Sequence, residues 1–326
     1  MNARAATQPK MTPPKKAPEG APSKQKTGRP PRKKRSKRYR RLVQHGWISD
    51  QHGAWPIAIV PLVFGLITGS LVAGTTSERS WGNITLTVLA VVAIIIAWMS
   101  AFLDFSALTA WLKSKRKPRY HKAIITYTSI AAACALIIAI AVPRVIVWLI
   151  LLVPFFTATT VLTWTGRDRS FITRVCSIVA SLIMIPLLTD VVSSRVFSRN
   201  WSLWSAFLCD LPFVWFLAGG LGAYYVASVP YVKTMIRERG SKLWIAFSIG
   251  IHALFLAITI WGYTQGFVSW LMITMWIILL GRATAMPYVL HRKGKPIHPK
   301  YVGKLEVYLS IFIFIGLILS IPGNVG

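Results

Sequence analysis

Long apolar runs separated by short polar links fill the chain from about residue 55 onward. An α-helix needs about 20 consecutive apolar residues to cross the roughly 30 Å hydrocarbon core of a bilayer. Because lipid offers the backbone no hydrogen-bonding partners, such runs predict helices that satisfy their own polar groups. We therefore predict an all-α, polytopic transmembrane helix bundle of nine spans, at residues 55–75, 84–111, 123–142, 145–164, 171–192, 204–230, 243–262, 267–288 and 304–322.

The links between these runs alternate in charge. Six basic residues lie from Lys113 to Lys122 after the second run, whereas Arg144 stands alone after the third. The segment 231–242 is basic again, and the link at 263–266 carries no charge. Basic residues are enriched in the cytoplasmic links of multi-pass proteins. The alternation therefore predicts a cytoplasmic N-terminus and an external C-terminus.

Composition agrees with a membrane protein and adds a strong positive charge. The 326 residues are 54% hydrophobic and 14% charged, with a formal net charge of +29. Such a charge could indicate nucleic acid binding, but 15 of the 38 Lys and Arg residues precede Leu42 and most others occupy alternate links. We predict a disordered basic cytoplasmic tail at 1–46, resting on anionic lipid headgroups, and a transmembrane domain at 47–326. Nucleic acid is not an expected partner.

The segment 231–242 carries the densest polar chemistry after the tail. On a helix, Lys233 and Arg237 lie four residues apart and share a face, and Gly240 would end that helix. A basic helix end at a membrane surface can hold phosphate, with arginine supplying a planar fork of donors. The alternative is a basic loop that only fixes topology.

The beginning of the first span is a second polar cluster. His52 and Gly53 precede Pro56, which suits the first turn of a helix and leaves nearby amides free for an anion. His52 is predicted to face a phosphate together with the 231–242 segment; the alternative is a solvated side chain. The basic link after the second span opens on the same side. The predicted ligand-binding residues are His52, Arg119, Lys233, Arg237, Glu238 and Arg239.

Ionisable side chains inside predicted spans are costly and are functional candidates by default, and three of them lie at a similar depth. Asp104, His252 and Arg282 lie six to nine residues from the cytoplasmic ends of their spans. At 1.5 Å per residue, all three are about 9–14 Å into the membrane. They could line one buried polar pocket, with Asp104 as acceptor or proton carrier and His252 as a switchable partner. The alternative is a structural role, either a pair of Asp104 with Arg282 or a His252 that is bonded to a Ser on the next helix.

Small residues spaced by four predict close contacts between helices. The pairs are Gly65 with Gly69, Gly219 with Ala223, and Ala246 with Gly250. At the fifth span, Ser170 is predicted to cap the helix, with Asp168 near its positive end.

Motifs of ordinary soluble catalysis are absent from the sequence, which has no Gly-x-Ser-x-Gly, Walker loop or His-Glu-x-x-His. Cys134, Cys176 and Cys209 lie in apolar runs without metal-ligand spacing. We predict no metal and no cofactor, and the sequence leaves open whether the protein is an enzyme.

Three pieces of sequence carry a resemblance to a known family: Gln-His-Gly-Ala-Trp at 51–55, Lys-Pro-Arg-Tyr at 117–120 and Tyr-Val-Lys-Thr-Met-Ile-Arg-Glu-Arg at 231–239. With these pieces the chain resembles the YwiC-like family of bacterial integral membrane proteins, over about residues 46–322. The resemblance implies a multi-pass protein of the bacterial cell membrane. It implies no particular activity.

The nine-span architecture is also similar to that of the UbiA-type prenyltransferases, which hold a magnesium-bound diphosphate with aspartates spaced four apart. Magnesium prefers several oxygen ligands, yet none of Asp104, Asp168, Asp190 and Asp210 has such a partner. Three functions are therefore under consideration. They are binding of an anionic phosphate-bearing lipid or small molecule, proton-coupled transport through the buried polar pocket, and lipid transfer without the usual metal motif.

Overall fold

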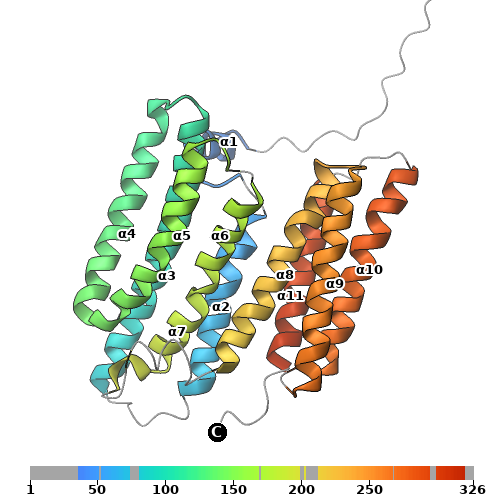
Figure 1. The fold of residues 1–326 in the computed structure, drawn as a ribbon. Helices are drawn as coiled ribbons and strands as arrows, with labels where there is room; N and C mark the ends of the chain where they lie inside the picture. The colour runs from blue at the N-terminus through green and yellow to red at the C-terminus, as the bar shows by residue number, and fades with distance from the viewer. Residues whose placement is uncertain are drawn as a thin grey trace, which may run out of the picture.

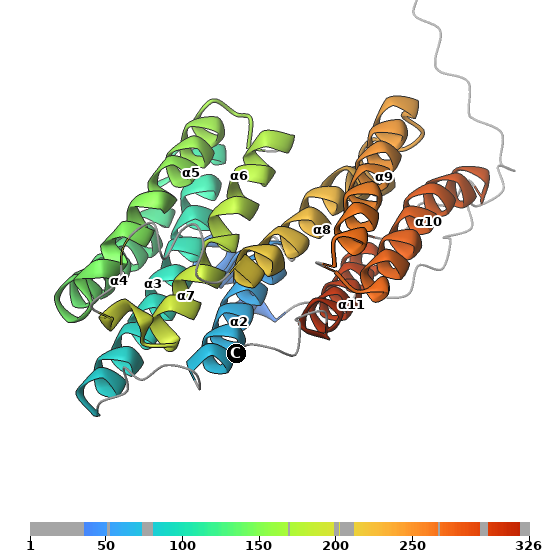
Figure 2. The same ribbon diagram turned by 60° about the horizontal axis from the view of Figure 1, so that its bottom comes forward.

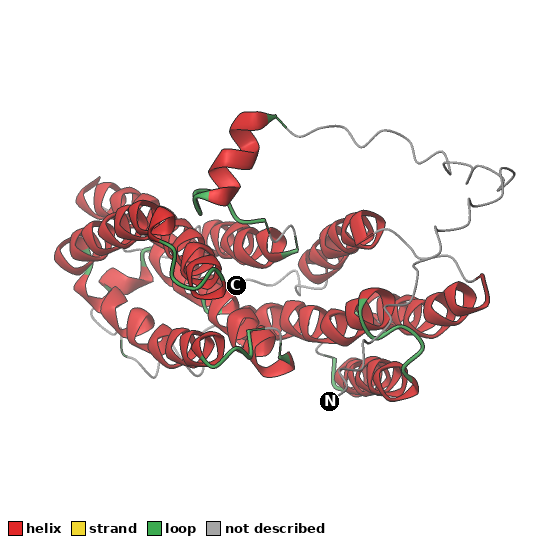
Figure 3. Cartoon of the chain, turned by 90° about the horizontal axis from the view of Figure 1, so that it is seen from above, coloured by secondary structure: helices red, strands yellow, loops and turns green. Residues whose placement is uncertain are grey.

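The computed structural model describes residues 36–50, 53–73, 81–168, 170–198, 202, 212–266, 268–293 and 299–319. Over these residues every regular element is a helix, as the colours of Figure 3 show, which confirms the predicted all-α class. The α-helices are α1 (Lys37–Gln44), α2 (Ala54–Ala73), α3 (Trp81–Lys113), α4 (His121–Ala141), α5 (Ile146–Trp164), α6 (Phe171–Leu182), α7 (Met184–Val192), α8 (Pro212–Ile236), α9 (Lys242–Thr264), α10 (Trp270–Lys293) and α11 (Pro299–Leu319). Short 3₁₀ helices lie in the links: η1 (Pro118–Tyr120), η2 (Pro143–Val145) and η3 (Arg195–Phe197).

Eight helical stretches in these ranges are long and apolar enough to cross a membrane. They correspond to the first eight predicted spans, with α6 and α7 together forming the fifth. The ninth predicted span corresponds to α11, whose apolar part, Leu305–Leu319, is shorter than the others. The chain is therefore a polytopic transmembrane helix bundle.

The most basic links lie at one end of the bundle. In Figure 1 the α3–α4, α5–α6 and α8–α9 links are at the top, near α1, whereas the α4–α5 and α9–α10 links are at the bottom. We call the end that carries α1 the basic end. An up-and-down bundle separates links in this way whenever their charge alternates along the chain. That the basic end faces the cytoplasm stays a prediction from the positive-inside rule.

α1 lies within residues 1–46, where composition predicts a disordered tail, and the structure describes Lys37–Gln44 as a helix. The side chain of Ser36 caps this helix. The following segment is held against α4, because the Tyr127 hydroxyl donates to the Trp47 carbonyl at 2.7 Å and the two rings meet edge to face. Lys and Arg are good helix formers, so a cap and a tertiary anchor are enough to order this part of the tail. Residues 1–35 lie outside the described residues.

α2 and α7 pack through glycine. A Cβ added at Gly65 would lie 2.7 Å from Leu188 Cβ, and one added at Gly69 would lie 3.1 Å from the Leu188 carbonyl oxygen. At the same crossing the hydroxyls of Thr68 and Thr189 lie 2.5 Å apart and share a hydrogen bond. The predicted close contact at Gly65 and Gly69 is confirmed.

The other two small-residue pairs do not mark close contacts, so this part of the prediction is wrong. A Cβ added at Gly219 or Gly250 would have no described atom within 4 Å. On α8 the tight positions are Gly220 and Gly222, where an added Cβ would lie 2.7 Å from Leu317 of α11 and 2.6 Å from Leu182 of α6. One residue along a helix turns the side chain by about 100°, so the contact face differs from the one that the spacing suggested.

The fifth span is broken at Ile183, between α6 and α7. Pro186 lies in the first turn of α7 and has no amide hydrogen to donate to the carbonyl four residues earlier, so the hydrogen-bond ladder is interrupted. At the other end of the span, Ser170 caps α6 as predicted by accepting from the Thr173 amide at 3.1 Å. Asp168 pairs with Lys113 of α3 at 2.5 Å.

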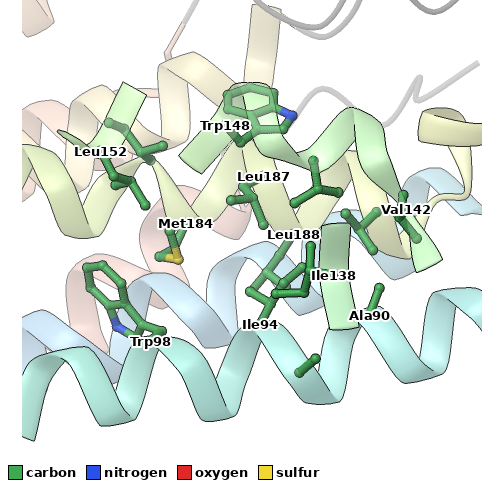
Figure 4. Close-up of a cluster of buried hydrophobic side chains, with 14 of the residues drawn as sticks. Ala90, Ile94, Trp98, Ile138, Val142, Trp148, Leu152, Met184, Leu187 and Leu188 are labelled. Atoms are coloured by element: carbon green, nitrogen blue, oxygen red, sulfur yellow. The ribbon is translucent and has the colours of Figure 1, made fainter. Parts of the chain in front are cut away.

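Two clusters of buried apolar side chains share the interior. The first, shown in Figure 4, joins α3, α4 and α5 to α7, with Ile94, Ile138, Leu152 and Leu187 among its members. The second lies among α8, α10 and α11 and includes Ile185 of α7. All residues of α7 except Val192 are buried. In Figures 1 and 2, α2 and α7 lie between the two groups of helices, and α7 contributes to both clusters.

Candidate functional site

An ion pair inside the bundle joins α10 to α11. Arg282 Nη1 donates to Glu306 Oε1 at 2.5 Å, and only 7% of the Arg282 side chain and 17% of the Glu306 side chain are exposed. Arg282 lies seven residues from Val289, where its apolar span ends, a depth of about 10 Å. Charges at such depth are costly even when paired, so this pair is a functional candidate by default.

Tyr224 of α8 completes the hydrogen bonding of Glu306. Its hydroxyl lies 2.9 Å from Glu306 Oε2 and 3.1 Å from the Glu306 carbonyl oxygen. Ser310 Oγ donates to the same carbonyl at 2.7 Å. Each carboxylate oxygen therefore has a donor, Oε1 from Arg282 and Oε2 from Tyr224.

Tyr231, two helical turns further along α8, covers one face of the guanidinium. The Arg282 Cζ lies 4.0 Å from the centroid of the Tyr231 ring, a cation–π contact. The Tyr231 hydroxyl donates to Met286 Sδ at 3.1 Å. The aromatic ring thus links α8 to α10 directly above the ion pair.

A small apolar layer, made of Tyr231, Met235, Met286 and Val302, separates the ion pair from the basic end. Met286 and Val302 each lie four residues, or one helical turn, nearer to the basic end than the charged residue of their own helix. Met235 follows Tyr231 by the same interval on α8. The ion pair is therefore closed off by side chains from three helices.

His252 of α9 lies beside this group. It is 1% exposed, its Nδ1 lies 2.7 Å from the Ser248 carbonyl oxygen, and its ring meets Trp276 edge to face. Because a carbonyl only accepts, Nδ1 carries the proton in this contact. Arg282 is close enough to act on the imidazole electrostatically. The structure therefore brings together His252 and Arg282, two of the three members of the predicted pocket.

Asp104, the third member, is elsewhere. It is on α3, where Oδ2 accepts from Thr128 of α4 at 3.2 Å. α3 and α10 lie on opposite sides of the bundle in Figures 1 and 2. The prediction that Asp104 shares one pocket with His252 and Arg282 is therefore corrected. It rested on equal depth in the membrane, and depth does not determine which helices are neighbours in the bundle. The partner of Arg282 is Glu306.

Three buried polar atoms on α9 and α10 have no hydrogen-bond partner among the described residues. They are Arg282 Nε, Arg282 Nη2 and Ser248 Oγ. A buried donor without a partner costs about 1–3 kcal/mol. Retaining three such atoms in one group of helices indicates a purpose beyond packing.

The segment 231–242 ends α8 and begins α9. α8 ends at Ile236, so Arg237 and Glu238 lie in the turn and not on the helical extension that the sequence predicts. Gly240 has a φ of 75° and reverses the chain, as predicted. The side chain of Arg237 is exposed at this turn.

The cations of this segment differ in their contacts. Lys233 Nζ lies 4.1 Å from the centroid of the Trp244 ring, which holds the ammonium group against α9. Arg239 Nε donates to the Met235 carbonyl at 2.7 Å and so closes the end of α8. Arg174 of α6 is close enough to Lys233 to act on it electrostatically. Cations from α6 and α8 thus meet at the basic end.

Arg119, another predicted ligand-binding residue, does not join this group. Arg119 lies in η1, where Nη2 donates to the Tyr120 hydroxyl at 3.0 Å. η1 leads into α4, which lies on the far side of the bundle from α9 in Figures 1 and 2. His52 lies outside the described residues.

Sequence reasoning missed Glu306 and Tyr224. Glu306 lies only two residues inside the ninth predicted span, 304–322. From the sequence it is therefore interpreted as a residue of the polar link and not of the membrane interior. Charged groups inside a membrane usually pair with one another. With only nine Asp and Glu residues in the chain, a search for the partner of Arg282 in neighbouring spans could have found Glu306.

The side chains around the ion pair can supply positive charge and hydrogen bonds. A guanidinium, a carboxylate, a phenol and an imidazole meet within one group of helices, a set that can recognise an anion or carry a proton. Across the described part of the chain, no three His, Cys, Asp or Glu side chains are grouped so that they could hold a metal ion.

The fold and this interior define the class: an α-helical, multi-pass membrane protein with ionisable groups buried among its C-terminal helices. The predicted resemblance to the YwiC-like family is confirmed, because residues 48–189 match the family model described as YwiC-like protein. A relative from Bacillus subtilis (strain 168), the "Uncharacterized protein YwiC", is 23% identical over 210 residues, which cover 64% of this chain and 74% of the relative. No solved structure matches the chain.

The family match covers α2 to α6 and most of α7. It includes the sequence pieces at 51–55 and 117–120, whereas the piece at 231–239 and the Arg282–Glu306 pair lie beyond it. The two candidate sites in the C-terminal helices therefore lie outside the matched region, and the membrane class follows from the apolar helices.

Proposed function

We propose that the protein resides in the bacterial cell membrane and binds an anionic, phosphate-bearing ligand at its basic end, where α6, α8 and α9 meet. One observation carries the proposal: Arg174 from α6 and Arg237 from the α8–α9 turn both act electrostatically on Lys233. Glu238 supplies one negative charge to this group. Gathering three cations costs free energy that an anionic ligand would offset.

The beginnings of two helices reinforce the positive potential. α6 begins at Phe171 and α9 at Lys242, and the beginning of α6 contacts the second turn of α9, because the Phe171 and Phe247 rings are 5.4 Å apart. Helix N-termini carry partial positive charge and present free amide groups to anions. Ser241 makes no side-chain capping bond to α9, so its first amides are left to other acceptors.

The cations combine fixed groups with an adaptable one. Lys233 is held against Trp244 and Arg239 is bonded to the Met235 carbonyl, while the side chain of Arg237 is exposed at the turn. Arginine presents parallel donors that match the oxygens of a phosphate group. A phosphate on a lipid headgroup and a phosphate on a soluble compound would satisfy the same donors.

The test is a double variant, Lys233→Ala with Arg237→Ala, in the full-length protein reconstituted in phosphatidylcholine nanodiscs. Binding of a polyprenyl phosphate, supplied in the nanodisc, and of inorganic phosphate, supplied in solution, would be measured separately. We expect the affinity for at least one of them to fall tenfold or more.

Lys122→Ala is the matched control, because it removes an exposed charge from the same end of the molecule but on α4. It should leave both affinities unchanged. Equal binding by the double variant and the unmodified protein would exclude the proposal, and equal losses in the double variant and the control would reduce the effect to general surface charge.

Proton-coupled transport remains a hypothesis with a changed set of residues. Glu306 takes the place of Asp104 beside His252 and Arg282. Proton-coupled transport would be detected as solute flux driven by a pH gradient in proteoliposomes. Lipid transfer, the third hypothesis, would require a lateral opening to lipid beside the 231–242 segment.

A further inference from the structure

The guanidinium of Arg282 uses only one of its three nitrogen atoms in hydrogen bonding. Nη1 pairs with Glu306, whereas Nε and Nη2 are buried and have no partner in the described part of the chain. With 7% of its surface exposed, the side chain is more than nine-tenths buried. Water outside the bundle therefore does not compensate these two donors.

Nε and Nη2 belong to the same edge of the guanidinium. On this edge the two N–H bonds run parallel, at a spacing that matches two oxygens of a carboxylate or phosphate. If Arg282 and Glu306 served only each other, the carboxylate would gain most by pairing with this two-donor edge. Instead, Glu306 accepts hydrogen bonds from Arg282 Nη1 and from the Tyr224 hydroxyl. The Nε–Nη2 edge of Arg282 does not bond to Glu306.

The neighbouring helix α9 contributes two further polar residues. α9 packs along α10, and it supplies Ser248, whose buried hydroxyl also lacks a partner, and His252, which lies within electrostatic reach of Arg282. A hydroxyl can donate a further hydrogen bond to an oxyanion. The unused donors are therefore not confined to one side chain.

Charge balance favours a small anion over a neutral ligand. Arg282 and Glu306 together are neutral, and Tyr224 shares the carboxylate by donating to Oε2. The guanidinium consequently keeps positive potential on its far edge, in surroundings where Coulomb interactions are stronger than in water.

We propose that the Nε–Nη2 edge of Arg282 binds an oxyanion, the carboxylate or phosphate group of a ligand, inside the membrane among α8, α9, α10 and α11. The site is closed in this structure, because neither nitrogen is accessible to solvent. The apolar layer stands between it and the basic end. Met235 and Met286 in that layer have flexible side chains that can rearrange to admit a ligand.

This proposal does not depend on the one made for the basic end. The two sites use different residues and are separated by the apolar layer, so a Lys233→Ala, Arg237→Ala variant should keep its interior site. Failure of one set of measurements leaves the other set standing.

The test observes the Arg282 donors directly. The full-length protein, labelled with ¹⁵N-arginine, would be titrated with acetate and with inorganic phosphate in phosphatidylcholine nanodiscs, and in a separate arm with phosphatidic acid added to the nanodisc. Arg282→Lys identifies the Nε–H signal of Arg282 by its disappearance. We expect this signal to move on titration in the free-ion arm or the lipid arm, which distinguishes a soluble ligand from a headgroup.

Two substitutions should act in opposite directions. Arg282→Lys keeps the charge but loses the two-donor edge, so the affinity, measured by isothermal titration calorimetry because this variant lacks the Arg282 signal, should fall at least tenfold. Glu306→Gln keeps an oxygen for Nη1 and removes the competing negative charge, so the affinity should rise. An Arg282 signal that none of the three anions moves would overturn the proposal, and so would a Glu306→Gln variant that folds but binds no anion.

Discussion

Arg282 on α10 and Glu306 on α11 pair inside the bundle at 2.5 Å, in the part of the chain that the family match does not cover. Removing one partner leaves the other charge buried and alone, which typically costs about 3–5 kcal/mol. Glu306→Ala and Arg282→Ala should each lower the stability of the folded protein by about this amount, as measured by denaturant titration in detergent micelles.

The double variant Arg282→Met, Glu306→Met is the informative comparison for that pair. Replacing both charges with apolar side chains of similar length removes the desolvation cost together with the attraction. We expect it to be more stable than either single alanine variant. A double variant as unstable as the sum of the two single variants would show that the two residues act independently.

The crossing of α2 and α7 should tolerate no added carbon. At Gly69 an added Cβ would lie 2.5 Å from Val192 Cβ, and at Gly65 it would lie 2.8 Å from the Met184 carbonyl oxygen. Overpacking of a buried contact typically costs about 1–3 kcal/mol. Gly65→Ala and Gly69→Ala should each show this loss in thermal unfolding in detergent.

Gly250→Ala is the matched control for the crossing, because an added Cβ there has no described atom within 4 Å. Alanine is also the better helix former, by about 1 kcal/mol in water. The control should be neutral or slightly stabilising. A loss at Gly250 equal to that at Gly65 would mean that glycine matters here for a reason other than close approach.

The capping of α6 and α9 provides a second matched pair. Ser170 Oγ accepts from the Thr173 amide at 3.1 Å, whereas Ser241 makes no such bond to the beginning of α9. Loss of a capping hydroxyl costs about 1 kcal/mol. Ser170→Ala should therefore lower the melting temperature measurably, and Ser241→Ala should not.

Orientation can be tested by labelling single cysteines in intact cells, after the native cysteines have been replaced by serine. Lys117→Cys lies in a basic link and Gln265→Cys in the α9–α10 link, and both positions are exposed. The positive-inside rule predicts that a membrane-impermeant maleimide reacts with Gln265→Cys alone. Labelling of Lys117→Cys alone would invert the whole assignment.

The sequence predicts the class and the span positions well because both depend on one-dimensional quantities. Twenty apolar residues make a span wherever they stand, and the helices found from Ala54 to Leu319 follow the predicted runs. The cap at Ser170 is equally local. These features need no knowledge of which helix lies next to which.

The sequence does not reveal which helices lie next to one another in the bundle. Asp104 and Arg282 have similar depths but lie on helices that do not meet, while the real partner, Glu306, sits near the edge of a predicted span. Gly219 and Gly65 share the same spacing motif, and only Gly65 faces a neighbouring backbone. The contact that holds the segment after α1, between Trp47 and Tyr127 of α4, likewise joins residues that are far apart in the sequence.

α7 is enclosed by protein on nearly every side, since every residue from Met184 to Val191 is buried. Such a segment cannot complete its surroundings while the ribosome is still adding α8, because α8 is one of the helices that pack against it. Biogenesis of this membrane protein should therefore end with a late docking step. Chains truncated before Pro212 should be short-lived in cells and targets of membrane proteases.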